Sequence, residues 1–232
     1  MAELIVALDV ASVKEVECVV DLLGDVVSFY KIGLELFSME GPGVVAAVKS
    51  RGKNVFLDLK LHDIPRTVVR AVKAGASLGV DLMTIHAVGG RAMIRAAKEA
   101  ALSCGVRAPK ILAVTVLTSL DQNDLTDIGV SRDVRGQVEA IGELAFTNGA
   151  DGIVCSPQEV RHMRTLLGPD ALLVTPGVRP EGADVGDQKR VMTPAEAVRD
   201  GSTHLVIGRP ILEAASPRTA ALEILRQMTE GL

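Results

Sequence analysis

The chain has 232 residues, of which 48% are hydrophobic and 23% are charged, and its formal net charge is −4 at pH 7. This length and composition suit one globular α/β barrel and exclude a disordered or fibrous protein. The negative charge argues against a nucleic-acid partner bound by a broadly basic surface, although a few local arginines would suffice for one phosphate.

Eight short apolar segments alternate with amphipathic ones along the whole chain, and each is short enough for a β-strand. In chain order, the predicted strands span residues 4–10, 27–33, 54–60, 81–87, 110–117, 152–155, 171–177 and 204–209. Predicted helices between them include residues 13–23, 65–78, 91–103 and 134–148. Near-continuous apolar strands separated by helices predict a parallel sheet that is covered by helices. Because there is no linker or change in composition, we expect a single-domain (β/α)₈ TIM barrel over residues 1–232, with a doubly wound open sheet as the alternative.

Other sequence signals point to a soluble cytoplasmic protein. Cys18, Cys104 and Cys155 are scattered without C-x-x-C spacing, so we expect neither a disulfide framework nor a zinc site and interpret all three as small buried residues. The N-terminus enters a predicted strand without a signal-peptide pattern, and no apolar run is long enough to span a membrane.

Polar residues recur where the predicted strands end. In a (β/α)₈ barrel, these carboxyl ends converge on the face that holds the catalytic residues. One charge at a strand end is ordinary, but four on the first three strands predict a shared site. The strand-end residues are Asp9, Lys31, Asp58, Lys60, His86, Thr118, Pro176, Gly177, Gly208 and Arg209.

The segments at the ends of the seventh and eighth predicted strands carry a phosphate-binding pattern. The sequence reads T-P-G-V-R-P at 175–180 and I-G-R-P at 207–210. Glycines let backbone N–H groups approach an anion, and Arg179 and Arg209 can donate forked hydrogen bonds to it. We therefore expect a phosphomonoester ligand. The long polar connection at 179–190 is either a surface loop or a lid over the site.

Charges interrupt the third apolar strand. Residues two apart on a strand share a face, so Asp58 and Lys60 are expected to point together into the barrel mouth. A buried lysine stays charged where carboxylates hold it, and Asp63 is a second candidate partner. Asp63 lies past the strand end, where it could reach a neighbouring subunit. The alternative is an ion-pair network that only fixes the loop.

The run D-L-K-L-H-D-I-P-R-T-V at 58–68 resembles the signature of the orotidine 5′-monophosphate decarboxylase family in its shorter bacterial form. Further matching segments occur in the family's order over almost the whole chain. They are I-V-A-L-D (5–9), Y-K-I-G-L-E-L-F (30–37), T-I-H-A (84–87), T-V-L-T-S (115–119), T-P-G-V-R-P (175–180), D-Q-K-R (187–190) and I-G-R-P-I (207–211).

The resemblance implies decarboxylation of orotidine 5′-monophosphate to uridine 5′-monophosphate, the last step of pyrimidine nucleotide synthesis. It implies that Lys60 protonates carbon 6 of the pyrimidine and that Asp58 lies beside the substrate carboxylate. Asp63 would enter the site from the partner subunit of a homodimer. Lys31 would join this network and the ribose hydroxyls, with Asp9 as another ribose contact.

The resemblance also assigns substrate contacts outside the charged network. It implies no metal and no cofactor, and it leaves His62 and His86 as residues with structural hydrogen bonds. The implied contacts are Ile64 and Thr67 across the dimer interface, Thr118 and Pro176 at the base, Gln188 between base and phosphate, and Arg179, Gly208 and Arg209 at the phosphate.

Two other functions remain open from the sequence. A related group of barrels uses the same D-x-K-x-x-D core with magnesium to decarboxylate or condense sugar phosphates. That group needs an acidic residue near the end of the second strand, where this chain has Lys31, and we expect Glu35 in the following turn. A non-catalytic phosphate-ligand sensor is the second alternative, but it would not need a lysine between carboxylates.

Overall fold

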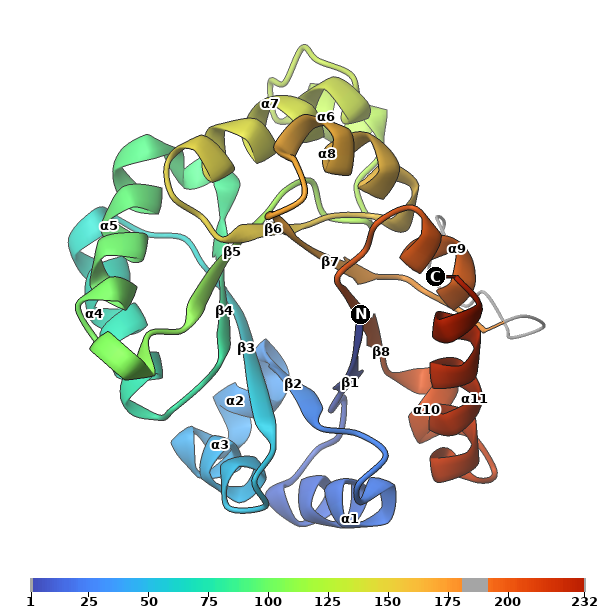
Figure 1. The fold of residues 1–232 in the computed structure, drawn as a ribbon. Coiled ribbons are helices and arrows are strands. Elements are labelled where there is room, and N and C mark those ends of the chain that lie inside the picture. Colours follow the sequence, from blue (N-terminus) through green and yellow to red (C-terminus); the bar gives the residue numbers. More distant parts are fainter. Residues whose placement is uncertain (1, 181–191, 232) are drawn as a thin grey trace.

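Eight parallel strands form a closed barrel in chain order in a computed structural model, which describes residues 2–180 and 192–231 (Figure 1). The barrel closes where β1 pairs with β8, with Ile5 opposite Val206. This confirms the predicted (β/α)₈ barrel and excludes the open sheet. The strands are β1 (Glu3–Ala7), β2 (Phe29–Gly33), β3 (Asn54–Leu61), β4 (Leu82–His86), β5 (Lys110–Val114), β6 (Gly152–Val154), β7 (Leu172–Pro176) and β8 (His204–Ile207).

Helices surround the barrel (Figure 1). The α-helices are α1 (Val13–Leu23), α2 (Leu34–Glu40), α3 (Pro42–Lys49), α4 (Pro65–Ser77), α5 (Gly90–Leu102), α6 (Gln122–Asp127), α7 (Val134–Thr147), α8 (Val160–Leu167), α9 (Pro194–Arg199), α10 (Arg209–Leu212) and α11 (Pro217–Glu230). Three short 3₁₀ helices are η1 (Ala87–Gly89), η2 (Gly105–Arg107) and η3 (Pro157–Glu159). The four predicted helices are confirmed to within one residue at each end. Several helices of the structure begin at ordinary start signals. The Ser12 hydroxyl accepts the Glu15 N–H at the start of α1, and prolines begin α3, α4 and α11.

Several predicted strands are longer than the observed ones at their carboxyl ends. β1 ends two residues before Asp9, β5 ends four residues before Thr118, and Arg209 begins α10 instead of ending β8. The reason is that apolar residues continue past the last ladder pair: Val116 is buried in the loop after β5. Hydropathy therefore locates these strands but does not mark where each one ends.

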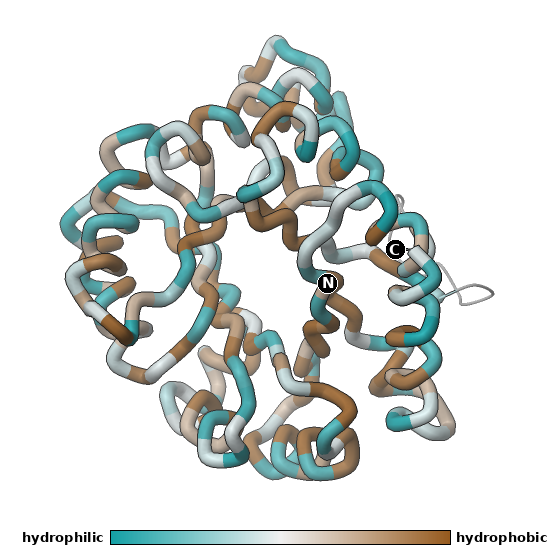
Figure 2. The backbone as a smooth tube through the Cα atoms, viewed as in Figure 1, coloured by the Kyte–Doolittle hydropathy of each residue, from teal (hydrophilic) through white to brown (hydrophobic). Residues whose placement is uncertain are grey.

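The core has two layers, one inside the barrel and one between the barrel and its helices. Hydrophobic residues, brown in Figure 2, recur along the strands of the barrel. Phe29 and Phe56 lie in the inner layer. Because side chains alternate along a strand, Lys31 and Asp58, two residues further on, face the same interior one level higher. The inside of the barrel is thus apolar at its centre and charged one level higher, toward the mouth at the carboxyl ends of the strands.

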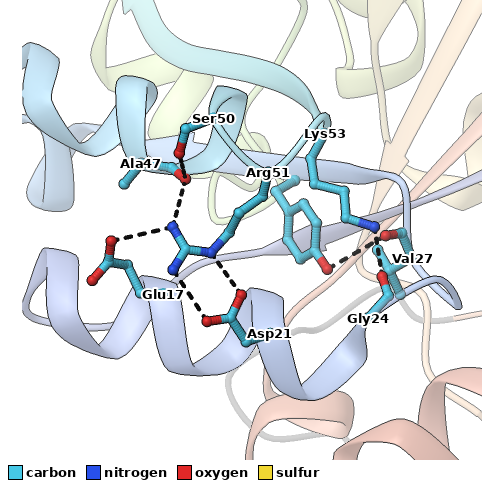
Figure 3. Close-up of polar contacts among 9 residues, drawn as sticks. Glu17, Asp21, Gly24, Val27, Ala47, Ser50, Arg51 and Lys53 are labelled. Atoms are coloured by element: carbon cyan, nitrogen blue, oxygen red, sulfur yellow. Dashed lines mark hydrogen bonds and ion pairs between the residues drawn. The ribbon is translucent and has the colours of Figure 1, made fainter.

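Arg51 ties the turn before β3 to α1 (Figure 3). Its guanidinium donates to both carboxylate oxygens of Asp21 at 2.6 and 3.1 Å, to Glu17 at 3.1 Å and to the carbonyl oxygen of Ala47 at 3.0 Å. The forked pair with Asp21 has the geometry that suits arginine. This contact holds α1 and α3 together on the outside of the barrel, next to β2 and β3. These two strands carry Lys31, Asp58 and Lys60.

The prediction that all three cysteines are buried holds for Cys155 alone. Cys155 is buried and Cys104 is half-buried, but Cys18 is exposed. The buried face of α1 carries Val16, Val20 and Leu23, and position 18 points away from it. Among residues 2–180 and 192–231, no helix combines the length and apolarity that crossing a membrane requires.

Candidate active site

A cavity of about 280 Å³ opens at the carboxyl ends of the strands. It is lined by loops from both ends of the chain, because β1 and β8 are neighbours in the closed barrel. Nine of the thirteen predicted site residues line it: Asp9, Lys31, Asp58, Lys60, Thr118, Pro176, Arg179, Gly208 and Arg209.

A bulge in β3 shapes the charged side of this cavity. Leu57 pairs with Met83 and Leu61 with Ile85, so β3 takes four residue steps where β4 takes two. Within the bulge, Lys60 has a φ of +51°, and it is the one non-glycine residue with positive φ in the described parts of the chain. Such strained backbone collects at functional sites. The Lys60 ammonium lies 2.8 Å from an Asp58 carboxylate oxygen, so these two residues point together as predicted.

Thr84 joins the two sides of the bulge. This fully buried residue of β4 accepts a hydrogen bond from the backbone N–H of Lys60 at 2.8 Å. Its hydroxyl donates to Asp58 at 2.9 Å, at the carboxylate oxygen that Lys60 does not contact. One hydroxyl therefore fixes both the strained backbone and the carboxylate. Thr84 could not be predicted as a site residue from the sequence, because a threonine in a strand is an ordinary strand former.

A second ion pair lies beside the first. The Lys31 ammonium is 3.2 Å from Asp9. Two glycines leave room for it: a Cβ on Gly33 would lie 3.1 Å from the Lys31 nitrogen, and a Cβ on Gly208 would lie 3.0 Å from an Asp9 oxygen. The ends of β1, β2 and β8 are thus built around this pair.

The opposite end of the cavity has the features of an anion site. Gly177 has a φ of +80°, which a side chain would strain. Arg179 is buried, its backbone N–H donates to the Met192 carbonyl oxygen at 3.0 Å, and its guanidinium donates to the Val178 carbonyl oxygen at 3.0 Å. Four cationic and two anionic side chains line the described cavity, which gives it a formal charge of +2. The cavity therefore suits an anionic ligand.

The middle of the cavity is apolar. Val114, Val154 and Val206 line it together with Pro176. Cys155 also lines it, but burial raises the pKa of its thiol well above the usual range. The thiol is therefore neutral at physiological pH. The middle of the cavity thus has an apolar surface, against which a flat ring could pack between the two charged ends.

Four predicted site residues do not line this cavity. Asp63, Ile64 and Thr67 are exposed, and the Asp63 carboxylate accepts a hydrogen bond from the backbone N–H of Ile64 at 2.6 Å. Within the described parts of the chain, no ion pair joins Asp63 to Lys60. Gln188 lies outside the described residues.

His62 and His86 face one another beside the bulge, with ring centroids 5.6 Å apart and ring planes 46° from parallel. In the described parts of the chain, neither ring forms a hydrogen bond with another residue, so the structural hydrogen bonds expected of them stay a prediction. Burial lowers the pKa of His86, and the charges of His62 and Lys60 lower it further. At neutral pH, the His86 ring is therefore neutral.

The described residues contain no group of three or more histidine, cysteine, aspartate or glutamate side chains arranged to hold a metal ion. Glu35 lies in the first turn of α2, as expected. It lines a side pocket of about 130 Å³ that reaches Asp58 and Lys60.

Comparisons with known proteins agree with this geometry. Residues 2–224 match the model of the orotidine 5′-phosphate decarboxylase / HUMPS family. Orotidine 5′-phosphate decarboxylase of Rhodopseudomonas palustris (strain HaA2) is 50% identical over 98% of this chain and 95% of its own length. The enzyme of the same name from Moorella thermoacetica is 49% identical over 97% of this chain and 92% of its own.

A solved structure shares the whole fold. Orotidine 5′-phosphate decarboxylase from Lactobacillus acidophilus superposes with a TM-score of 0.89 at 38% identity, covering 98% of this chain and 99% of its own. An uncharacterized conserved protein from Geobacillus kaustophilus superposes with a TM-score of 0.86, also at 38% identity. By sequence over nearly its full length and by fold, this chain belongs to the orotidine 5′-phosphate decarboxylase / HUMPS family.

Proposed function

We propose that this chain is a carboxy-lyase that converts orotidine 5′-monophosphate to uridine 5′-monophosphate and carbon dioxide. The observation that carries the proposal is the Asp58–Lys60 ion pair, seated in a strand bulge at one side of a cavity whose other side presents Arg179 and Arg209. The curated relatives at about half identity have this activity in their names. The proposed place of this reaction is the cytoplasm.

In the proposed reaction, the bond between carbon 6 of the pyrimidine and its carboxylate breaks. The electron pair stays on carbon 6, carbon dioxide leaves, and Lys60 delivers a proton to that carbon. A fixed cation at the developing negative charge is electrostatic preorganisation, and its proton transfer is general-acid catalysis. Asp58 holds the ammonium at 2.8 Å and faces the substrate carboxylate.

The rest of the cavity would bind the remainder of the nucleotide. Lys31 and Asp9 would contact the ribose, and Thr118 and Pro176 the pyrimidine. Arg179, Gly208 and Arg209 would bind the phosphate, with Gln188 assigned between base and phosphate by the family resemblance alone. Binding energy from the phosphate, which takes no part in the bond changes, can then serve the chemical step.

The metal-dependent alternative has less support. At the end of β2 the chain has Lys31, paired with Asp9, where the sugar-phosphate group needs an acidic residue. Full activity in EDTA is the expected result, and activity that requires added magnesium would favour the alternative. A phosphate sensor would bind the nucleotide without turnover.

The first test is the absorbance change on conversion of orotidine 5′-monophosphate, measured without added cofactor. Lys60→Ala should lower kcat by at least about 10³-fold, because it removes both the cation and the proton donor. Lys14→Ala is the matched control, since Lys14 is an exposed lysine of α1. Turnover by Lys60→Ala near the control rate would refute the role of Lys60, and no turnover by the unmodified chain would refute the activity.

We further propose a homodimer in which Asp63, Ile64 and Thr67 complete the partner's site. The support is a group of exposed apolar side chains just after three successive strands, β2, β3 and β4, at the barrel mouth: Leu34 (64% exposed), Ile64 (66%) and Val88 (53%). Exposed apolar groups clustered in this way mark interfaces. The side pocket beside Glu35 would give the partner's loop a route to Lys60, which has one carboxylate partner among the described residues of its own chain.

Mixing two inactive variants tests this arrangement. In a Lys60→Ala/Asp63→Ala heterodimer, one site carries both substitutions and the other carries neither. We expect activity to reappear after subunit exchange, with up to one active site per heterodimer. Exchange confirmed by mass spectrometry without recovered activity would contradict a shared site.

A further inference from the structure

We propose that His62 and His86 are positioning residues that hold the loop between β3 and α4, so that Asp63 reaches the partner's Lys60. This inference rests on the shared site proposed above. It assigns a role to two residues that the reaction itself does not use.

The loop needs such a tie because it has little packing of its own. Residues 62–64 of the loop and residues 65–67 at the start of α4 are all exposed. The Asp63 carboxylate is hydrogen-bonded to the next backbone N–H, and this local bond does not connect it to the barrel. A side chain offered to another subunit must nevertheless be held to within about 0.5 Å to be productive.

His62, the residue directly before Asp63, provides the connection. Its ring contacts the ring of His86, with the centroids 5.6 Å apart. His86 is the last residue of β4 and is half-buried in the barrel wall. A contact to the end of a barrel strand fixes the His62 side chain to the rigid part of the molecule, and Asp63 follows in the chain.

The start of α5 completes the seat for His62. A Cβ on Gly89 would lie 3.3 Å from Cδ2 of the His62 ring, which is tighter than most real contacts of this kind. The missing side chain at Gly89 therefore leaves room for both the His62 ring and Met93, which also contacts this position. His62 is exposed, and its ring is flanked by His86 at the end of β4 and by the turn at Gly89.

Mixed dimers show on which subunit His62 acts. His62→Ala should lower kcat on the order of tenfold, the cost of a slightly misplaced catalytic group, with little change in KM. Because His62 is proposed to act through Asp63, the lost activity should be that of the partner's site, which Asp63 enters. A heterodimer of His62→Ala and Lys60→Ala then has one site with an intact Lys60 and an intact partner loop.

After random exchange of equal amounts, activity should rise roughly fivefold above the sum of the separate chains, given a tenfold defect in the His62→Ala sites. His62→Phe, which keeps a ring at this position, should restore most of the kcat in the unmixed protein. His86→Ala should behave as His62→Ala does in both assays. His62 is exposed, so folding should be unaffected, and an unchanged urea midpoint checks this.

The Lys60→Ala/Asp63→Ala mixture separates the two ways of failing. If that mixture recovers activity but the His62→Ala mixture does not exceed the sum of its parts, the inference is wrong and His62 acts within its own chain. A kcat for His62→Ala equal to that of the unmodified chain also overturns it. If neither mixture recovers activity, the shared site is refuted, and this inference with it.

Discussion

At the scale of single residues, the hydroxyl of Thr84 is the contact on which both members of the Asp58–Lys60 pair depend. Thr84→Val keeps the shape but leaves the Lys60 N–H and one Asp58 oxygen without their partner. We expect kcat to fall by about 10- to 100-fold with little change in KM, because a shift near 1 Å at the reacting groups costs this much. Stability should fall by about 1–3 kcal/mol. Steady-state kinetics and urea unfolding measure the two effects.

Two controls separate positioning from packing. Thr84→Ser keeps the hydroxyl and should recover most of the kcat. Thr203→Val removes a comparable hydroxyl, which accepts the Leu173 N–H at 2.9 Å at the other end of the barrel. It should lower stability and leave kcat unchanged. Equal losses of kcat in Thr84→Val and Thr203→Val would show that the effect is general destabilisation.

Single residues also show how far sequence reasoning reaches. Asp58 and Lys60 could be predicted because strand periodicity places them on one face, and the structure pairs them at 2.8 Å. Thr84 could not, because its role depends on a register shift between two strands that are distant in the sequence. Asp63 shows the other limit: in one chain it is exposed, and its proposed role requires a second chain.

At the scale of elements, periodicity identified all eight strands but not the bulge in β3. A register shift is a property of a pair of strands, and here no glycine marks it: the left-handed position is Lys60 itself. Helix bounds were more accurate, because caps and prolines signal helix ends locally. Strand ends at the mouth have no such signal, since the apolar pattern continues into buried loops.

The shortest strand gives an element-scale prediction. A Cβ on Gly152 in β6 would collide with the Leu172 carbonyl of β7, a backbone group that cannot move without breaking the β6–β7 pairing. Gly152→Ala should therefore destabilise the protein by about 3 kcal/mol or more in urea unfolding. Gly43→Ala is the matched control: its Cβ meets nothing within 4 Å, and in the first turn of α3 it should be neutral or stabilising by up to about 1 kcal/mol. Similar midpoints for the two variants would contradict the close approach.

At the scale of the whole molecule, two histidines at opposite ends of the barrel link its stability to pH. His86 lies at the mouth, and His204 lies at the start of β8, where its ring meets Phe29 edge-on at 6.0 Å. Burial is the main cause that lowers the pKa of each. The unfolded chain, with histidine pKa values near about 6.5, therefore binds protons that the folded chain excludes.

The sign of the effect follows from this difference. Above about pH 6.5, both histidines are neutral in either state and do not change the free energy of unfolding. As the pH falls below about 6.5 toward the lowered folded pKa values, the unfolded state gains protons and stability decreases. Carboxylates such as Asp21 and Glu196, whose pKa values are lowered by hydrogen bonds, add their own loss only below about pH 4.5. The interval between about pH 4.5 and 6.5 therefore isolates the histidines.

Urea midpoints measured from pH 5 to 8 at constant ionic strength and protein concentration test the prediction. The midpoint should be flat above about pH 6.5 and decline below it. His204→Asn keeps a polar group beside Thr203, whose hydroxyl lies 2.9 Å from the ring nitrogen, and cannot be protonated. It should flatten part of the decline, and His86→Asn with His204→Asn should flatten more. A decline of the same slope in the double variant would show that other groups set the pH dependence. Because His86 ends β4 at the mouth and His204 begins β8 at the opposite end of the barrel, their two contributions should add.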